Sequence, residues 1–361
     1  MKKKIKLFDP NIGKDEKQKI SQVLESKFWA SGSGTGNVLK FENQFKKYLS
    51  SDDCIAVNSG TSALNLALSL IDIKKKEVIL PSLSFVSTAH AVIINGGTPV
   101  FVDIEPETMC IDPNEIQKSI TPKTTAILPV HFGGFPCNLK DIQNIAEKHN
   151  LTIIEDAAHA VGAIYNNKKI GNHGTAVCFS FHPVKNLAMP TGGLISINHK
   201  NHKQFRKTLL ARRWCGITDR IGSEYNVKEL GWNYYMNEFS AVIGLAQLKK
   251  LNRLNNIRKN IAKFYDNQID VEHKTVFNKD CSYHLYWILV KNRKKFREKM
   301  WKAGIETGTH YKPIHTMKMY QNHTVLLNTE RVGKQIVTIP IHPNLKTFEM
   351  DKIVSSINKF A

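Results

Sequence analysis

A lysine stands between two apolar runs of the sequence. Lys185 ends the segment 180–185 (SFHPVK), and the apolar runs 176–179 and 194–197 lie before and after it. Lysine normally keeps its ammonium in water, so a lysine between two core strands is unusual. An amine that is partly removed from water has a lowered pKa and becomes a nucleophile toward carbonyl groups. The alternative is an exposed loop lysine, and the rest of the sequence has to distinguish the two.

An aspartate follows another apolar run, in the segment 153–159 (IIEDAAH). Open α/β sheets bind ligands at the carboxyl ends of their strands, where Asp156 is expected. Pyridoxal phosphate needs a carboxylate against its ring nitrogen, which keeps the nitrogen protonated and lets the ring accept electrons. We interpret Asp156 as that carboxylate, with Glu155 on the opposite face and His159 near the ring hydroxyl. The alternatives are a helix cap for Asp156 and a packed core histidine for His159.

An anion site is indicated by the turn 58–62 (NSGTS), which joins an apolar run to a helical pattern. Backbone N–H groups at a helix N-terminus, together with hydroxyl side chains, bind phosphate. An ordinary helix cap is the alternative, because serine and threonine are common caps. The residues that we expect around the phosphate are Gly60, Thr61, Ser62 and Ser180.

A flat cofactor ring also needs an aromatic face to stack on, and Phe85 in the segment 81–85 is the candidate. A core aromatic residue is the alternative. Each of these features is common by itself. Their order along the chain, with each near the end of an expected strand, favours a cofactor held as a Schiff base by Lys185 over an exposed lysine.

The elements that must position these groups follow an alternating pattern. Short apolar runs expected as strands alternate with helical patterns, which is typical of an α/β domain with a mostly parallel sheet. The strands are continuous apolar runs, so they are expected to be buried on both faces. The expected strands are 54–57, 78–80, 100–102, 126–130, 152–154, 176–179 and 194–197. The helices expected up to the last strand are 14–27, 38–49, 63–70, 84–95 and 139–149, and 28–36 is a glycine-rich loop.

The pattern changes after residue 197. We expect a basic helix over 203–213, a polar loop over 219–228 and a long helical stretch over 236–264. Further on, we expect a strand over 286–290 and helices over 293–303 and 348–360. The predicted domains are a large α/β domain over 1–235, a linking helix over 236–267 and a small C-terminal α+β domain over 268–361.

Composition limits the class of protein. The 361 residues are 42% hydrophobic, which supports a sizeable core, and the formal net charge is +20. The charge could indicate a nucleic-acid partner or an anionic small substrate. The lysines are spread along most of the chain, which favours a generally lysine-rich composition with some added attraction for phosphorylated ligands. The basic stretch 200–213 is short, and we expect no nucleic-acid partner. Six scattered cysteines indicate free thiols in a reducing cytoplasm and no metal site. No apolar segment follows the basic start, so we expect neither a signal peptide nor a membrane span.

On these motifs the sequence resembles the sugar aminotransferases of the DegT/DnrJ/EryC1/StrS group. The motifs that carry the resemblance are 58–64 (NSGTSAL), 155–159 (EDAAH) and 180–185 (SFHPVK). The resemblance implies the aspartate aminotransferase fold, PLP fold type I, with a mostly parallel seven-stranded sheet between helices. It implies Lys185 as the Schiff-base lysine, Asp156 as the partner of the ring nitrogen, and His159 beside the cofactor. It also implies that Asn233 reaches the phosphate of a neighbouring subunit, hence a homodimer with shared active sites.

The same resemblance implies a substrate and an activity. The chain would transfer an amino group from L-glutamate to a nucleotide-linked keto sugar, best a 4-keto-6-deoxyhexose, in amino-sugar biosynthesis for surface polysaccharide such as lipopolysaccharide O-antigen. The alternatives are a 3-keto sugar, a sugar dehydratase on the same fold and a non-catalytic regulatory protein. Thr191 and Tyr235 depart from the family, which commonly has glutamate and arginine there. The expected substrate-binding residues are Trp29, Ser31, His182, Arg212, His310, Tyr311 and His315.

Overall fold

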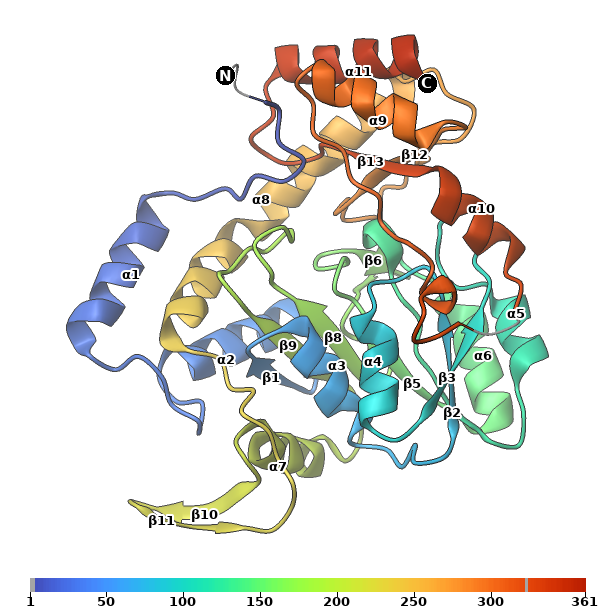
Figure 1. The fold of residues 1–361 in the computed structure, drawn as a ribbon. Helices are drawn as coiled ribbons and strands as arrows, with labels where there is room; N and C mark the ends of the chain where they lie inside the picture. Colours follow the sequence, from blue (N-terminus) through green and yellow to red (C-terminus); the bar gives the residue numbers. More distant parts are fainter. Residues whose placement is uncertain (1–3, 322–323) are drawn as a thin grey trace.

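A seven-stranded sheet lies at the centre of the molecule (Figure 1). The computed structural model describes residues 4–321 and 324–361, so residues 1–3 of the basic start lie outside it. The strand order is β1-β9-β8-β5-β4-β2-β3, and only β9 runs antiparallel to its neighbours. The expected mostly parallel α/β fold is confirmed. The strands are β1 (Asp53–Val57), β2 (Glu77–Pro81), β3 (Thr98–Val102), β4 (Thr124–Ile127), β5 (Thr152–Asp156), β8 (Ala176–Ser180) and β9 (Gly193–Ile197).

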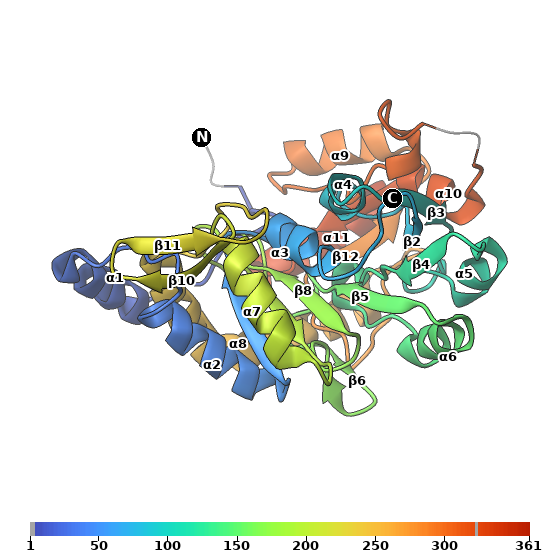
Figure 2. The ribbon, with the colours of Figure 1, turned by 90° about the horizontal axis from the view of Figure 1, so that it is seen from below.

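Helices cover both faces of this sheet (Figures 1 and 2). Successive strand residues enter two different hydrophobic clusters: Ala56 of β1 packs into one and Ile55 into the other. The strands are therefore buried on both faces, which is why the sequence shows continuous apolar runs instead of alternation. The covering helices are α2 (Asn37–Leu49), α3 (Gly60–Leu68), α4 (Ser87–Ile94), α5 (Pro113–Ser119), α6 (Leu139–His149) and α7 (His202–Arg213).

The helix α8 (Glu238–Gln268) connects this part to the C-terminal elements at the top of Figure 1. There β12 (Tyr286–Leu289) pairs antiparallel with β13 (Ile336–Ile339). The remaining helices are α1 (Lys14–Ser26), which packs against α8, and α9 (Arg293–Lys302), α10 (Leu327–Gln335) and α11 (Thr347–Phe360). The domain limits stay a prediction.

Several expectations for local structure are wrong: the strand expected over 126–130 is Thr124–Ile127, and the helix expected over 84–95 is Ser87–Ile94. The expected polar loop 219–228 is largely a hairpin of β10 (Ile217–Ile221) and β11 (Glu224–Val227), which projects from the body beside α7 (Figure 1). Its residues are mostly exposed, so no buried face left an apolar alternation in the sequence. The helix expected from residue 63 begins at Gly60, because Ser59 caps it by accepting a hydrogen bond from the Ser62 N–H.

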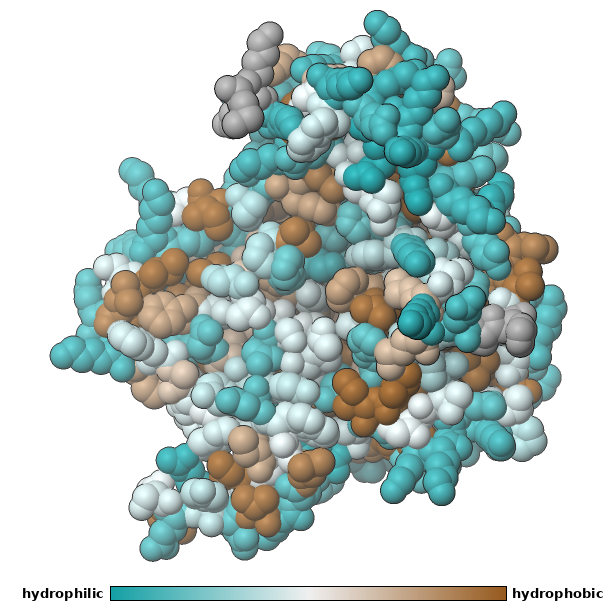
Figure 3. Space-filling model, in the orientation of Figure 1, coloured by the Kyte–Doolittle hydropathy of each residue, from teal (hydrophilic) through white to brown (hydrophobic). Residues whose placement is uncertain are grey.

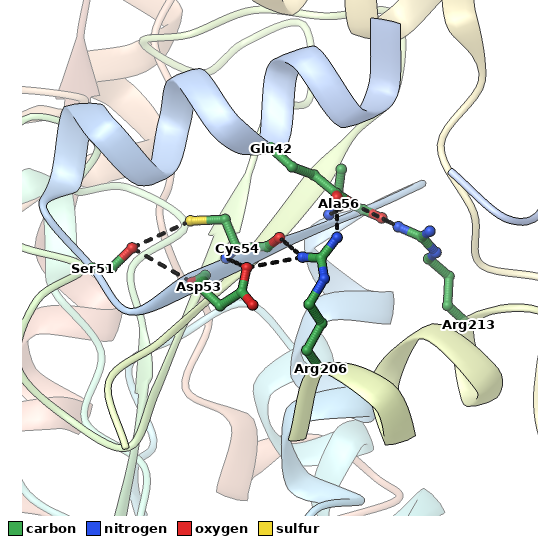
Figure 4. A network of polar contacts seen from close by, with 7 residues as sticks. All are labelled: Glu42, Ser51, Asp53, Cys54, Ala56, Arg206 and Arg213. Atoms are coloured by element: carbon green, nitrogen blue, oxygen red, sulfur yellow. Dashed lines mark hydrogen bonds and ion pairs between the residues drawn. The ribbon is translucent and has the colours of Figure 1, made fainter. Parts of the chain in front are cut away.

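A buried ionic network joins α2, β1 and α7 (Figure 4). The Arg213 guanidinium is fully buried and donates to Glu42 (2.7 Å) and to the Ala56 carbonyl (2.9 Å). Arg206 donates to the second oxygen of Glu42 (3.0 Å) and to Asp53 (2.9 Å). The network fixes the end of β1, from which the chain enters the turn before α3.

The outer surface is varied in polarity. Side chains over α9 and α11 are largely hydrophilic (Figure 3), in keeping with the lysines and arginines of these helices. Within residues 4–321 and 324–361, no helix is both long enough and apolar enough to cross a membrane.

Candidate active site

A cavity of about 320 Å³ opens where the carboxyl ends of β5 and β8 meet the N-terminus of α3. The topology explains this position, because parallel strands present their carboxyl ends at one edge of the sheet. The cavity therefore brings together motifs that are far apart in the sequence. The motif residues that line it include Gly60, Thr61, Asp156, His159, Ser180 and Lys185.

Lys185 lies in the turn after β8, where its backbone N–H donates to the His182 carbonyl (2.8 Å). The side chain is partly buried in the cavity. Burial lowers the pKa of the amine to about 8, and the negative charge of Asp156 opposes part of that shift. A fraction of the amine is consequently unprotonated near neutral pH, as a nucleophile or general base requires.

Asp156 is the last residue of β5 and is almost completely buried. Its Oδ2 accepts a hydrogen bond from the Thr88 hydroxyl (2.8 Å) and its Oδ1 accepts one from the Ala158 N–H (3.1 Å). Burial raises the pKa of the carboxyl, whereas these two bonds and the Lys185 charge act in the opposite direction. Glu155 points away, as expected, and pairs with His131 (2.8 Å). The buried carboxylate that faces the cavity is therefore that of Asp156.

The first turn of α3 forms the candidate phosphate site. Gly60 and Thr61 line the cavity at the positive end of the helix, where backbone N–H groups have no helical partner. A Cβ atom on Gly60 would lie 2.6 Å from the Cβ of Ser180, so only glycine fits. Ser62 does not line the cavity, and its hydroxyl donates to Asn58 (2.6 Å). Gly60, Thr61 and Ser180 fit a phosphate; Ser62 instead stabilises the turn.

Aromatic and imidazole side chains form the walls of the cavity. The half-exposed Phe85 lies with its ring centroid 6.1 Å from that of Tyr311. His159 Nδ1 accepts from the Gly133 N–H (3.2 Å), so its proton is on Nε2, which lies 3.1 Å from the Tyr311 hydroxyl. Burial holds the pKa of His159 well below its usual value, so the ring is neutral. These walls suit a flat ring between Phe85 and the His159 side.

Three of the expected substrate residues line the cavity and four do not. His182, His310 and Tyr311 line it, and burial lowers the pKa of His310 to about 4. Arg212 pairs with Glu229 (2.7 Å) in a separate hollow.

The other three expected substrate residues, and Asn233, also lie outside the cavity of their own chain. His315 is buried against Ser82 (2.6 Å). The side chain of Trp29 is exposed against Phe239. Ser31 and Asn233 are at the surface, where the Ser31 hydroxyl meets that of Ser33 (2.6 Å).

Two residues that contact Asp156 or Lys185 were not expected from the sequence. Thr88, in α4, donates to Asp156, and His284, before β12, has its Nε2 3.4 Å from the Nζ of Lys185. Both contacts join segments far apart in the chain, and no local pattern announces them. Among the described residues, no group of three or more His, Cys, Asp or Glu side chains is placed to hold a metal ion.

Comparison with known proteins identifies similar sequences over nearly the whole chain. Residues 10–358 match the DegT/DnrJ/EryC1/StrS aminotransferase family. An uncharacterized protein of Methanocaldococcus jannaschii is 34% identical, over 98% of this chain and 96% of its own length.

Two solved structures have the same fold over nearly the whole chain. Helicobacter pylori PseC, described as an aminotransferase involved in the biosynthesis of pseudoaminic acid, has a TM-score of 0.93 and 30% identity, covering 99% of both chains. S. venezuelae DesV, solved in complex with a ketimine intermediate, has a TM-score of 0.88 and 29% identity, covering 95% of this chain and 93% of its own.

Proposed function

The chain belongs to the DegT/DnrJ/EryC1/StrS aminotransferase family, and on that basis we propose that this pyridoxal phosphate-dependent sugar aminotransferase moves the amino group of L-glutamate to a nucleotide-linked keto sugar. The observation that carries the proposal is the partly buried amine of Lys185, which lies with the buried carboxylate of Asp156 in one cavity. The Gly60–Thr61 turn supplies the phosphate site of the same cavity.

Different residues of the chain have different roles in the proposed reaction. Pyridoxal phosphate, when bound, supplies an aldehyde and a ring that accepts electrons. Asp156 would keep the ring nitrogen protonated, and Thr88 orients the carboxylate through its hydrogen bond. Lys185 would hold the cofactor through its amine, and the same amine, when free, is the group that could take up and release a proton in the cavity. Phe85 and His159 line the same cavity and would confine the ring.

The acceptor that fits the proposal best is a 4-keto-6-deoxyhexose on a nucleoside diphosphate. H. pylori PseC is described as involved in the biosynthesis of pseudoaminic acid, which supports a similar class of pathway here. The net charge of +20 favours a substrate with a diphosphate. Surface polysaccharide, such as lipopolysaccharide O-antigen, is the proposed destination and the cytoplasm the proposed location.

Purified protein and a panel of acceptors test the proposal. The protein should be yellow, and borohydride should fix the cofactor on Lys185 in a peptide map. Nucleotide-linked 4-keto and 3-keto sugars, each assayed for 2-oxoglutarate released from glutamate, identify the acceptor. A Lys185→Ala variant is the matched control and should release none. A colourless protein that takes up no cofactor would contradict the proposal, and loss of a sugar hydroxyl without 2-oxoglutarate would indicate the dehydratase.

A further inference from the structure

A buried histidine contacts the amine of Lys185. His284 is 1% exposed, and its backbone N–H donates to the Gly133 carbonyl (2.9 Å). Its ring lies between Phe8, with centroids 5.6 Å apart and nearly parallel planes, and His159, with centroids 4.5 Å apart. The Nε2 atom is 3.4 Å from the Nζ of Lys185. The imidazole is thus packed against two other rings, with one nitrogen toward the amine.

The direction of this hydrogen bond follows from the protonation states. Burial, and then the charge of Lys185, hold the pKa of His284 well below its usual value, so the ring is neutral. A lysine ammonium has only donors, so Nζ donates and Nε2 accepts. The single imidazole proton is then on Nδ1, which is buried and has no partner among the described residues. A buried donor without a partner lowers the stability of a fold. The fold nevertheless leaves Nδ1–H of His284 unpaired, and in this tautomer Nε2 can accept from the amine of Lys185.

We propose that His284 is a positioning residue for the transamination, which accepts a hydrogen bond from the Lys185 ammonium and holds the amine at one place in the cavity. The other titratable or charged groups that face the pair are Asp156, His159, His182, Arg258 and His310.

If the proposed function holds, a neutral acceptor such as His284 suits the proton transfer by Lys185 better than a carboxylate would. When Lys185 takes a proton from a substrate carbon, it becomes an ammonium in a cavity with little water, and burial opposes that charge. A second carboxylate at the position of His284 would stabilise the ammonium so strongly that the amine would become a poor base. A neutral imidazole stabilises it less, which leaves the amine able both to take and to release the proton.

Competitive labelling of the cofactor-free full chain tests the contact without any sugar substrate. Acetic anhydride modifies unprotonated amines, and peptide mass mapping gives the labelling midpoint of each lysine against pH. The wild-type midpoint for Lys185 is expected near pH 8. His284→Phe removes the acceptor and should lower the midpoint by about one unit. His284→Gln keeps an acceptor and should stay close to the wild-type value.

A matched control separates this role from a structural one. His342 is buried, also near Arg258, and bonds to the Lys6 carbonyl and not to Lys185. His342→Phe should leave the Lys185 midpoint unchanged. Should His284→Phe not fold, His284→Leu is the second variant. An unshifted midpoint in the folded variant, or an equal shift in His284→Gln, would overturn the proposal.

The half-reaction with glutamate alone gives a second readout. The absorbance of the bound cofactor follows one half-reaction. In His284→Phe, the maximal rate of this half-reaction should fall about tenfold, with little change in the glutamate concentration at half-saturation. His284→Gln should recover most of that rate. If the wild-type chain aminates no sugar in the panel, the proposed acceptor fails while the labelling result still stands. If His284→Phe needs more glutamate for half-saturation but keeps the wild-type maximal rate, that result would count against a role for His284 at Lys185.

Discussion

At the scale of single residues, the amine of Lys185 is expected to destabilise the cofactor-free fold. Its pKa is lowered from 10.5 to about 8 by burial, so below pH 8 the folded chain holds a charge that prefers water. The unfolded chain binds more protons between pH 8 and 10.5, and stability therefore rises with pH across that window. The fold thus loses some stability by burying an amine that the proposed chemistry requires.

A Lys185→Met variant tests this cost. Without cofactor at pH 7, it should be more stable than wild type by on the order of 2 kcal/mol, after allowance for the part of the side chain that stays hydrated. Urea unfolding at pH 7 and pH 9.5 measures the difference, which should shrink at the higher pH. Lys17→Met, at an exposed position in α1, is the control and should change stability little at either pH. A difference that is independent of pH would contradict the assignment to the amine.

Thr88 is expected to act through Asp156. Its hydroxyl donates to Oδ2 (2.8 Å) and opposes the effect of burial on the pKa of that carboxyl. Thr88→Val keeps the shape but removes the donor, so the pKa of Asp156 should rise and less of it should be ionised. We expect kcat to fall about tenfold, with the acid limb of its pH profile moved to higher pH. Thr88→Ser retains the hydroxyl and should behave like wild type; an unmoved acid limb in Thr88→Val would contradict this role.

At the scale of elements, local sequence explains the strands and most helices but not the side chains that meet across them. The helix predicted over 139–149 has the bounds of α6, and in the structure Asn138 caps it by accepting a hydrogen bond from the Asp141 N–H. His284 and Thr88 were missed because their partners come from other elements, so only the folded topology brings them together. The hairpin of β10 and β11 was missed because it packs little against the body and carries no buried face.

The buried network of α2, β1 and α7 should be a principal contributor to the stability of the large sheet (Figure 4). Glu42→Gln would leave the fully buried Arg213 guanidinium without its opposite charge. We expect a loss of about 3 kcal/mol in the free energy of unfolding, because a buried charge is left unpaired. Urea unfolding measures this, with cofactor content as a check on the folded fraction.

The double variant Glu42→Gln with Arg213→Met is the matched test of that network. It removes the unpaired charge of Arg213 and should recover part of the lost stability, because the two side chains are in contact and their effects are coupled. If the double variant loses the sum of the two single losses, the pair does not act as a unit, and the expectation fails.

At the scale of the whole molecule, we propose that the site takes a residue from a second copy of the chain. Asn233 is exposed and lies outside the cavity of its own chain, whereas the sequence resemblance assigns it to the phosphate of a neighbour. The hairpin exposes Ile221 (82%), and the segment that follows it exposes Leu230 (78%). Both features fit the proposed homodimer, in which this region of each subunit meets the other.

Hybrid dimers test whether the sites are shared. Lys185→Ala removes the lysine of a site, and Asn233→Ala removes the group proposed to reach the phosphate of the partner's site. If each site takes its lysine from one subunit and its asparagine from the other, each homodimer has two damaged sites. A hybrid then has one site with both changes and one with neither. Mixing the variants under exchange conditions should therefore raise activity to about a quarter of wild type, because about half of the dimers are hybrids and half of their sites are intact.

The control for subunit exchange is a mixture of wild type with Lys185→Ala, whose activity should follow simple dilution. Asn233→Ala alone should chiefly weaken cofactor retention, because the side chain is proposed to hold the phosphate and takes no part in proton transfer. No gain on mixing, when mass measurements show that hybrids have formed, would mean that Asn233 serves its own chain. It would also mean that the cavity at Lys185 is completed without the partner.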